Sequence, residues 1–213
     1  MKSVTIVDYG AGNLLSVKRS FEFLGSNVIV TSDPKTILKS DRLVLPGVGA
    51  YPKAMNSLKK LNLISPIIEM AQNQKPLLGL CLGMQLLLEQ SEEFEVTQGL
   101  GLIQGQVVSI PGMKSSGDII KIPHVGWKSL KSLSPAADWF GTILSDVKPG
   151  EFTYFVHSYM AKPTNRDLIL AEVFYGGVQI PAVIKKDNIT GCQFHPEKSG
   201  VTGLKILKKF MDQ

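Results

Sequence analysis

The stretch LLGLCLGMQLLLEQ, residues 77–90, decides the fold. It places Cys81 between Gly79 and Gly83, where a short apolar run gives way to apolar residues at helical spacing. A strand that turns sharply into a helix needs glycine on both sides of the turning residue, because neighbouring side chains have no room there. The pattern is the cysteine version of the G-x-S-x-G nucleophile elbow, and it predicts an exposed thiol followed by a helix over residues 84–88.

Short apolar runs rich in branched residues precede the elbow and alternate with helical patterns. The expected strands are residues 3–8, 27–31, 42–46 and 75–80, and the expected helices are residues 13–25, 51–62 and 65–74, the last beginning at Ser65-Pro66. Strands that alternate with helices predict a parallel sheet covered on both faces.

The second half of the chain has a different pattern. Closely spaced strand-like segments cover residues 105–110, 118–127, 153–159, 168–186 and 188–195, with a hairpin signal at Gly176-Gly177 and a helix over residues 200–213. We find no internal repeat and no low-complexity linker. The sequence therefore predicts one α/β domain, residues 1–213, with a mixed, largely parallel central sheet and antiparallel strands in its second half.

Composition excludes several classes of protein. The 213 residues are 44% hydrophobic, and the longest apolar stretch is too short for a membrane helix. The N-terminus lacks a secretory pattern, so we expect a cytoplasmic protein without a membrane partner, in which Cys81 and Cys192 are both free. The net charge of +5 comes from scattered lysines without a basic run, which favours solvated lysine faces, with an acidic protein partner as the alternative and no nucleic-acid partner.

Cys81 has a plausible chemical partner in His195. At the start of a helix, Cys81 is favoured as a thiolate, and a thiolate nucleophile needs a base. In GCQFHPEKSG, residues 191–200, the side chains of Gln193, His195 and Glu197 fall on one face of an extended chain, so that Glu197 can orient the imidazole. The alternative for Cys81 is a buried structural cysteine. We expect no metal site, because no histidine has a second ligand at a metal-binding spacing.

Acyl transfer also needs hydrogen-bond donors for an oxyanion. The stretch PGVGA, residues 46–50, follows the third expected strand and reaches the same edge of the sheet as the elbow. Its backbone at Val48 and Gly49, with the N–H of Leu82, is the expected oxyanion hole. The similar stretch DYGAGN, residues 8–13, fails as a dinucleotide fingerprint because Leu15 stands at the third glycine position.

PGVGA, GLCLGMQLL and CQFHPEKSG, in that order, resemble the motifs of the class I, or triad, glutamine amidotransferases. The resemblance implies a flavodoxin-like fold, no cofactor, and a reaction in which Cys81 attacks the side-chain amide of glutamine. His195 would protonate the departing ammonia, and water would then cleave the glutamyl thioester. The residues that would hold glutamine are Gly49, Gln85, His157, Ser158 and Tyr159.

DYGAGNL, PHVGW (123–127) and YFVHSY (154–159) further resemble the glutaminase subunits of imidazole glycerol phosphate synthases, which act in histidine biosynthesis. This resemblance implies a heterodimer in which ammonia passes unprotonated into a (β/α) barrel. That cyclase partner makes imidazole glycerol phosphate and the aminoimidazole carboxamide ribonucleotide. The residues that would face the partner are Asn13, Trp127, Lys128, Tyr154 and Lys198.

One position departs from these subunits, which usually carry asparagine after GW where this chain has Lys128. Two alternatives therefore stay open. The same glutaminase chemistry would serve a sugar-modifying amidotransferase of surface-polysaccharide biosynthesis. A cysteine hydrolase or binding module of the same architecture is the other alternative, and the His-Pro-Glu segment argues against it.

Overall fold

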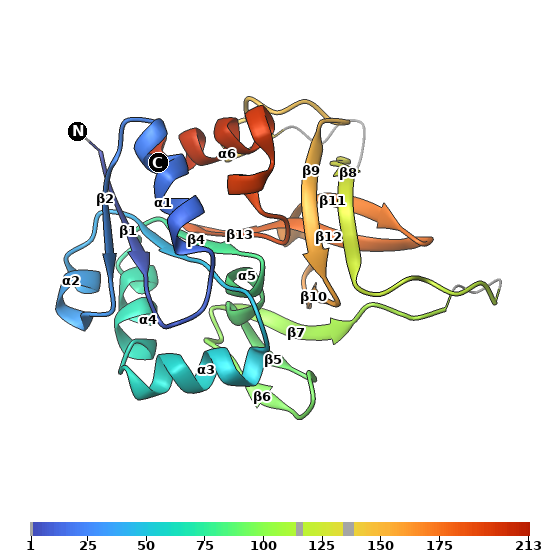
Figure 1. Ribbon diagram of the computed structural model, residues 1–213, viewed down its shortest axis with the longest axis horizontal. Coiled ribbons are helices and arrows are strands. Elements are labelled where there is room, and N and C mark those ends of the chain that lie inside the picture. The colour runs from blue at the N-terminus through green and yellow to red at the C-terminus, as the bar shows by residue number, and fades with distance from the viewer. Residues whose placement is uncertain (1, 114–116, 134–138) are drawn as a thin grey trace.

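The computed structural model describes residues 2–113, 117–133 and 139–213 and contains a large mixed sheet (Figure 1). Its strand order is β11 (Ile169–Tyr175), β12 (Val178–Lys186), β13 (Ile189–Cys192), β4 (Leu77–Leu80), β3 (Leu43–Leu45), β1 (Ser3–Val7) and β2 (Asn27–Thr31). The strands from β13 to β2 run parallel, and β11 and β12 are antiparallel. The predicted fold class, a largely parallel α/β sheet, is confirmed.

Helices cover both faces of this sheet. The helices are α1 (Leu14–Phe23), α2 (Pro34–Leu38), α3 (Tyr51–Lys60), α4 (Ile64–Gln72), α5 (Leu82–Leu86) and α6 (Gly200–Asp212), with single 3-10 turns η1 (Arg166–Leu168) and η2 (Pro196–Lys198). Side chains alternate along β3, so that Leu43 and Leu45 pack with α2, α3 and α4 while Val44 packs with α1 and α6. Two apolar cores result, one on each face.

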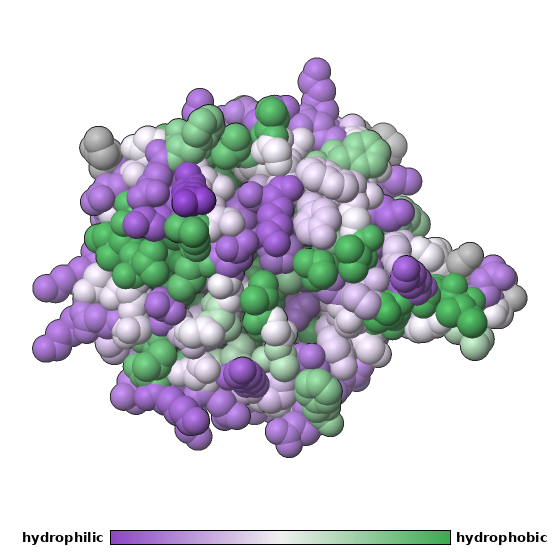
Figure 2. Space-filling view, viewed as in Figure 1, coloured by the Kyte–Doolittle hydropathy of each residue, from purple (hydrophilic) through white to green (hydrophobic). Residues whose placement is uncertain are grey.

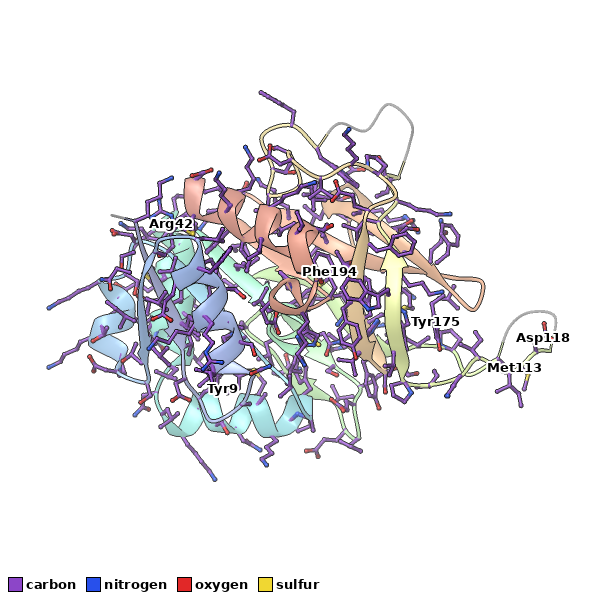
Figure 3. The ribbon with its side chains drawn as sticks, turned by 45° about the horizontal axis from the view of Figure 1, so that its top comes forward. Tyr9, Arg42, Met113, Asp118, Tyr175 and Phe194 are labelled. Atoms are coloured by element: carbon purple, nitrogen blue, oxygen red, sulfur yellow. The ribbon has the colours of Figure 1, made fainter. Side chains whose placement is uncertain are left out.

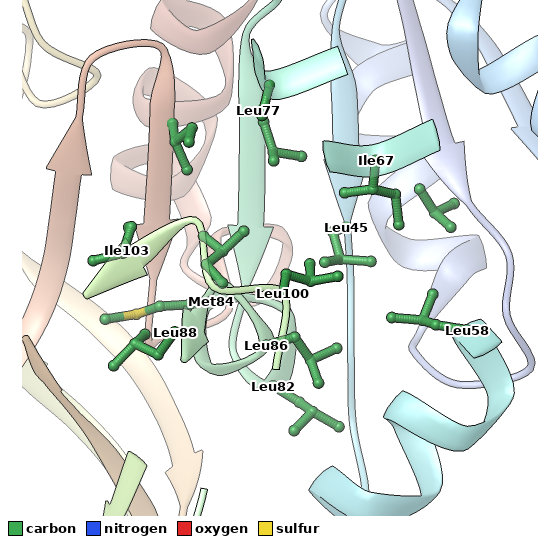
Figure 4. Close-up of a cluster of buried hydrophobic side chains, with 14 of the residues drawn as sticks. Leu45, Leu58, Ile67, Leu77, Leu82, Met84, Leu86, Leu88, Leu100 and Ile103 are labelled. Carbon is green, nitrogen blue, oxygen red and sulfur yellow. The ribbon is translucent and has the colours of Figure 1, made fainter. Parts of the chain in front are cut away.

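The core beneath α3 and α4 supports the elbow directly (Figure 4). It joins Leu45 of β3 and Leu77 of β4 to Leu82, Met84 and Leu86 of α5, all almost inaccessible to solvent. Burying side chains of this size stabilises the fold by about 1.5–3 kcal/mol each. The elbow is therefore held by a fully buried apolar core.

The structure corrects the lengths of two predicted helices. Helix α5 ends at Leu86, and Leu88 opens the strand β5 (Leu88–Ser91) instead of continuing the helix. The carbonyls of residues 86–88 accept hydrogen bonds from the amides of residues 100–103, so they have partners outside the helix. Helix α4 begins at Ile64 and not at Ser65-Pro66, because Pro66 fits the first turn, where no intrahelical N–H bond is needed.

Smaller sheets form the second half. One has the order β10 (Tyr159–Pro163), β7 (Ile103–Ser109), β5 and β6 (Thr97–Gln98), and the other pairs β8 (His124–Ser129) with β9 (Phe152–His157). The hairpin at Gly176-Gly177 is confirmed, with φ of 58° and 86°. The segment predicted as a strand from residue 118 becomes one only at His124, and the preceding residues form a projecting arm with Met113 and Asp118 at its tip (Figure 3).

None of the helices in the described part of the chain is both long and apolar enough to cross a bilayer.

Candidate functional site

The elbow has the strained geometry that its glycines predict, but the predicted exposure of the thiol is wrong, because Cys81 is only 6% exposed. Cys81 has φ of 52° and ψ of −110°, a conformation that side chains rarely adopt, and its N–H donates to the Cys192 carbonyl at 2.7 Å. A side chain at Gly79 would lie 2.7 Å from the Gly83 carbonyl, and one at Gly83 would collide with the Leu45 carbonyl. The packing of β3 against α5 thus fixes the thiol at the carboxyl edge of the sheet.

The predicted residues meet at one cavity of about 250 Å³. It is lined by Val48, Gly49, Cys81, Leu82, Gln85, Glu93, Pro123, Val156, His157, Ser158, Tyr159 and His195. They come from the segments that follow β3, β4 and β13, from α5, from the end of β9 and the start of β10, and from the segments after β5 and before β8. Every predicted catalytic, oxyanion and glutamine-binding residue lines this cavity except Glu197, which stands behind His195. A larger groove of about 980 Å³, on the side of β7 and β10, contains none of them.

His195 is held by Glu197 and by backbone contacts. Its Nδ1 lies 2.8 Å from Oε1 of Glu197, and the two side chains are 4% and 2% exposed. The predicted pair is present, but the expected extended face is wrong. β13 ends at Cys192, and Glu197 reaches the ring from the 3-10 turn η2. The backbone N–H of His195 donates to the Tyr154 carbonyl at 2.9 Å, which fixes the backbone that carries the imidazole.

His195 is charged over a wide pH range. Burial alone would lower the pKa of His195, but its interactions with Cys81 and Glu197 outweigh burial and raise the pKa to about 10. The opposite ring nitrogen, Nε2, is buried and has no hydrogen-bond partner within the described part of the chain. Because His195 and Cys81 line the same cavity, an imidazolium stands ready there to stabilise a thiolate or to give up a proton.

The other two histidines form a neutral pair. His157 Nε2 lies 3.0 Å from His124 Nδ1, and His157 Nδ1 lies 2.8 Å from the Tyr159 carbonyl. Burial lowers the pKa of His157 to about 4 and that of His124 to about 3. His124 is also stacked between the rings of Phe155 and Tyr175. Both histidines therefore contribute hydrogen bonds and ring packing while uncharged.

Tyr9 supports the loop PGVGA, residues 46–50, where the oxyanion hole is expected, and its role could not be seen in the sequence. Its hydroxyl donates to the Pro46 carbonyl at 2.7 Å, and burial raises the pKa of Tyr9. A side chain at Gly47 would lie 2.6 Å from that hydroxyl and 2.8 Å from the Gly83 nitrogen. The loop is thus pressed between Tyr9 and the elbow, with Gly49 at φ of 102°. The stretch DYGAGN contains Tyr9, but only its glycines carried a sequence signal.

Gln85 and Glu93 complete the polar lining, and the buried Gln193 is hydrogen-bonded to Gln85. Gln85 Nε2 donates to the Tyr159 carbonyl at 3.0 Å and to Gln193 Oε1 at 3.1 Å. Glu93, also missed from the sequence, accepts from the first N–H of α3 at 2.7 Å while lining the cavity. The cavity therefore presents a carboxylate at one place and a thiol with an imidazole at another.

The residues expected at a partner interface lie outside the cavity. Trp127 faces Tyr154 across the β8–β9 pair, with the rings 5.9 Å apart and Trp127 51% exposed. Lys198 is exposed in η2, and Asn13 precedes α1 without capping it through its side chain. On the face shown in Figure 2, apolar residues also gather over β2 and along the arm that leads to β8.

Comparisons with known proteins agree with this geometry. The family model described as "Glutamine amidotransferase class-I" matches residues 5–213. The chain is 51% identical to imidazole glycerol phosphate synthase subunit HisH 1 of Legionella pneumophila (strain Lens), over 99% of both chains. It is 47% identical to the HisH subunit of Lactococcus lactis subsp. lactis, over the full length of both.

Solved structures show the same fold at low identity. A structure described as a glutamine amidotransferase superposes with a TM-score of 0.73 at 13% identity, covering 98% of this chain and 97% of the other. PurLQS from Thermotoga maritima gives 0.71 at 19% identity, covering 100% and 99%. With the family match over nearly all of its residues, the chain belongs to the class I glutamine amidotransferase family.

Proposed function

We propose that this chain is the glutaminase subunit of an imidazole glycerol phosphate synthase, and that the triad is Cys81, His195 and Glu197. The observation that carries the proposal is the single cavity in which the strained cysteine, the histidine paired with Glu197 and the glycine loop PGVGA meet. The names of relatives that are about half identical over their whole length support the choice of synthase.

The chemistry follows from the positions of these groups. The Cys81 thiolate attacks the carboxamide carbon of glutamine, and the carbonyl π-electrons move to oxygen. The backbone N–H groups at Val48, Gly49 and Leu82 stabilise that oxyanion. His195 gives its proton to the amide nitrogen, the C–N bond breaks, and ammonia leaves a glutamyl thioester on Cys81. Water, deprotonated by His195, then releases glutamate and regenerates the thiol.

The lining of the cavity suits free glutamine as the substrate. Both Nε2 protons of Gln85 are already donated within the protein, so Gln85 acts toward the substrate through its Oε1 acceptor. Glu93 supplies negative charge for an ammonium group. A ligand with both an ammonium group and a side-chain carboxamide satisfies these groups, whereas a peptide amide offers no ammonium. Ser158 and Tyr159 contribute the backbone beside the substrate.

Ammonia produced in the cavity is then used elsewhere. We propose a cytoplasmic heterodimer with a (β/α) barrel cyclase, in which Asn13, Trp127, Tyr154 and Lys198 face the partner. Trp127 and Tyr154 are the anchors, because aromatic residues dominate the binding energy of interfaces. Ammonia must reach the barrel unprotonated, since ammonium is not nucleophilic, and an enclosed path between the subunits keeps it so.

The test mixes this chain with the cyclase barrel of the same organism and its nucleotide substrate, and follows product formed from glutamine. We expect Cys81→Ala to abolish glutamine-dependent product and to leave synthesis from ammonium salts intact. Cys192→Ala is the matched control, because it removes the only other thiol, which is 0% exposed.

Two other outcomes of this experiment would show which part of the proposed function is wrong. A barrel that uses ammonium but never accepts glutamine through this chain would point to a different synthase, such as a sugar-modifying one. Glutamine-dependent synthesis that survives Cys81→Ala would exclude Cys81 as the nucleophile.

A further inference from the structure

The nucleophile has a polar neighbour that the triad does not use. Gln193 is 0% exposed, and its side-chain amide lies between Gln85 and Cys81, with Nε2 3.8 Å from the Cys81 sulfur. It directly follows β13, the strand that lies beside β4 and ends with the backbone of Cys192 bound to Cys81. A buried amide at this position is held within reach of the reacting atom.

The direction in which this amide points follows from one carbonyl. The Tyr159 carbonyl can only accept, so the atom of Gln85 that lies 3.0 Å from it must be the donating Nε2. The second Nε2 proton of Gln85 then needs an acceptor 3.1 Å away, which must be Oε1 of Gln193. This leaves the NH₂ group of Gln193 facing the sulfur.

The two neutral histidines hold the same carbonyl in place. His157 Nδ1 must donate to the Tyr159 carbonyl, so in neutral His157 the Nε2 atom accepts from His124 Nδ1. Two donors therefore converge on Tyr159, one from His157 and one from Gln85. The polarity of the whole chain of hydrogen bonds, from His124 to the sulfur, has one solution.

We propose that Gln193 stabilises the Cys81 thiolate by donating an N–H to its sulfur, in an orientation imposed by Gln85 and the Tyr159 carbonyl. The thiol and the thiolate differ in their partners here. A thiol S–H has the Val156 carbonyl 3.8 Å away as its acceptor, whereas a thiolate has no proton for that carbonyl and accepts from Gln193. The Gln193 contact thus favours the nucleophilic form. The inference rests on Cys81 being the nucleophile of the proposed function.

The test measures the rate at which iodoacetamide alkylates Cys81 in the full chain across pH, with mass spectrometry of the Cys81 peptide. Neither glutamine nor the partner is needed. Burial raises the pKa of the Cys192 thiol, so that thiol stays unmodified and serves as an internal control. We expect Gln193→Met to slow alkylation near neutral pH by about tenfold and to move the pH profile upward, as for a lost hydrogen bond to a charged group.

Gln193→Glu replaces the donating NH₂ group with an oxygen that carries negative charge when ionised. It keeps an oxygen acceptor for Gln85 and places a second oxygen against the sulfur, so we expect a larger upward movement than in Gln193→Met. Gln179→Met is the matched control. Gln179 donates to Glu172 with a donor–acceptor distance of 3.3 Å, and this pair lies away from the cavity, so its loss should leave the pH profile unchanged. A melting temperature for each variant separates lost packing from lost reactivity.

The outcomes are distinguishable from failure of the proposed function. If wild-type Cys81 resists iodoacetamide at every pH, the nucleophile itself is wrong. If wild-type Cys81 reacts and the Gln193→Met profile superimposes on it, only the role of Gln193 is overturned. Should both variants fail to fold, ¹⁵N-labelled glutamine side chains decide the matter. The Gln193 amide resonance, assigned by its contact with Gln85, must move on Cys81→Ala, and an unmoved resonance refutes the inference.

Discussion

His195 and the His124–His157 pair are buried to a similar degree and behave in opposite ways. His195 has its pKa raised to about 10, whereas the pKa values of His157 and His124 are lowered to about 4 and 3. All three are at most 6% exposed. The difference lies in the partner, because His195 has the carboxylate of Glu197 and the others have a carbonyl and each other.

The contrast teaches that charge on the neighbour, and not depth of burial, decides which histidine carries a charge. Burial opposes an imidazolium at every one of these positions, and only at His195 do Cys81 and a carboxylate 2.8 Å away, that of Glu197, compensate for it. A carbonyl oxygen fixes the tautomer of a neutral imidazole, so no charge has to be buried. The charge on His195 in turn helps to keep His157 neutral.

The largest effect is expected when this contrast is removed at Glu197. Glu197→Gln keeps the shape of the side chain but deprives His195 of its only carboxylate contact among the described residues. We expect glutamine-dependent turnover to fall about 10³- to 10⁴-fold, as for the third member of other triads, while turnover from ammonium is unchanged. Steady-state rates of the complex with each nitrogen source measure it.

Glu151→Gln is the control for that substitution. Glu151 also accepts from a cation, Lys205 at 2.9 Å, but at the surface and away from the cavity. Surface pairs contribute about 0–1 kcal/mol, so both nitrogen sources should support normal rates. A small loss in Glu197→Gln, similar to that in Glu151→Gln, would refute the role assigned to Glu197.

The second effect is on stability and concerns the neutral pair. His124→Phe fits between the flanking rings but leaves His157 Nε2 buried without a donor, so we expect a loss of about 1–3 kcal/mol in the free energy of unfolding. His124→Asn offers a side-chain N–H in a similar place and should lose less. Denaturant unfolding of both variants compares them, and equal losses would mean that packing alone matters.

The pairing of His195 with Glu197 could be predicted from the sequence, for a limited reason. Glu197 stands two residues after His195, so the carboxylate partner is visible as a short motif in one segment. The elbow is also local, because Gly79 and Gly83 flank Cys81, and the parallel sheet follows from apolar runs. Each of these signals lies within a few residues of the group it explains.

Long-range partners were out of reach of the sequence. Tyr9 meets Pro46 across 37 positions, and Gln193 meets Cys81 across 112, so no local pattern marks either contact. The end of α5 was also misjudged, because its last carbonyls bind amides from residues 100–103. Hydrogen bonds between segments that are distant in the sequence determine the positions of Tyr9 and Gln193 and the end of α5, and such bonds leave no periodic pattern.

The third effect is a dependence of stability on pH, of opposite sign in the two regions. Unfolded imidazoles protonate near pH 6.5, whereas folded His157 does so only near pH 4. In that window the unfolded state binds more protons, so stability is present above pH 6.5 and is lost as the pH falls. We expect a loss of about 1 kcal/mol between about pH 7 and 5.5, reduced in His124→Phe, in denaturant unfolding at each pH.

His195 gives the alkaline counterpart. Its folded pKa of about 10 lies above the unfolded value, so the folded state binds more protons in between. Its contribution is complete below about pH 6.5 and is lost as the pH rises toward 10. Glu197→Gln should flatten this alkaline limb and leave the acid limb unchanged. A variant that flattens both limbs would show that the two regions are not independent.

The smallest effect is expected at Lys128, on β8, the strand that also carries His124. Neighbouring residues of a strand point to opposite faces, so Lys128 points away from the face of Trp127. Its Nζ lies 5.6 Å from the centre of the Tyr175 ring, a contact that contributes about 0.5–1 kcal/mol within the chain. A partner that docks on Trp127 and Tyr154 would hardly meet it.

Lys128→Asn should therefore change the affinity for the cyclase barrel by less than about threefold, whereas Trp127→Ala should weaken it by more than about tenfold. Titration of the barrel with each variant measures both. If Lys128→Asn instead strengthened binding by an order of magnitude, Lys128 would lie in the interface and would oppose this partner. The departure at Lys128 would then favour a different synthase, whereas a neutral result means that the lysine belongs to the packing of Tyr175 and His124.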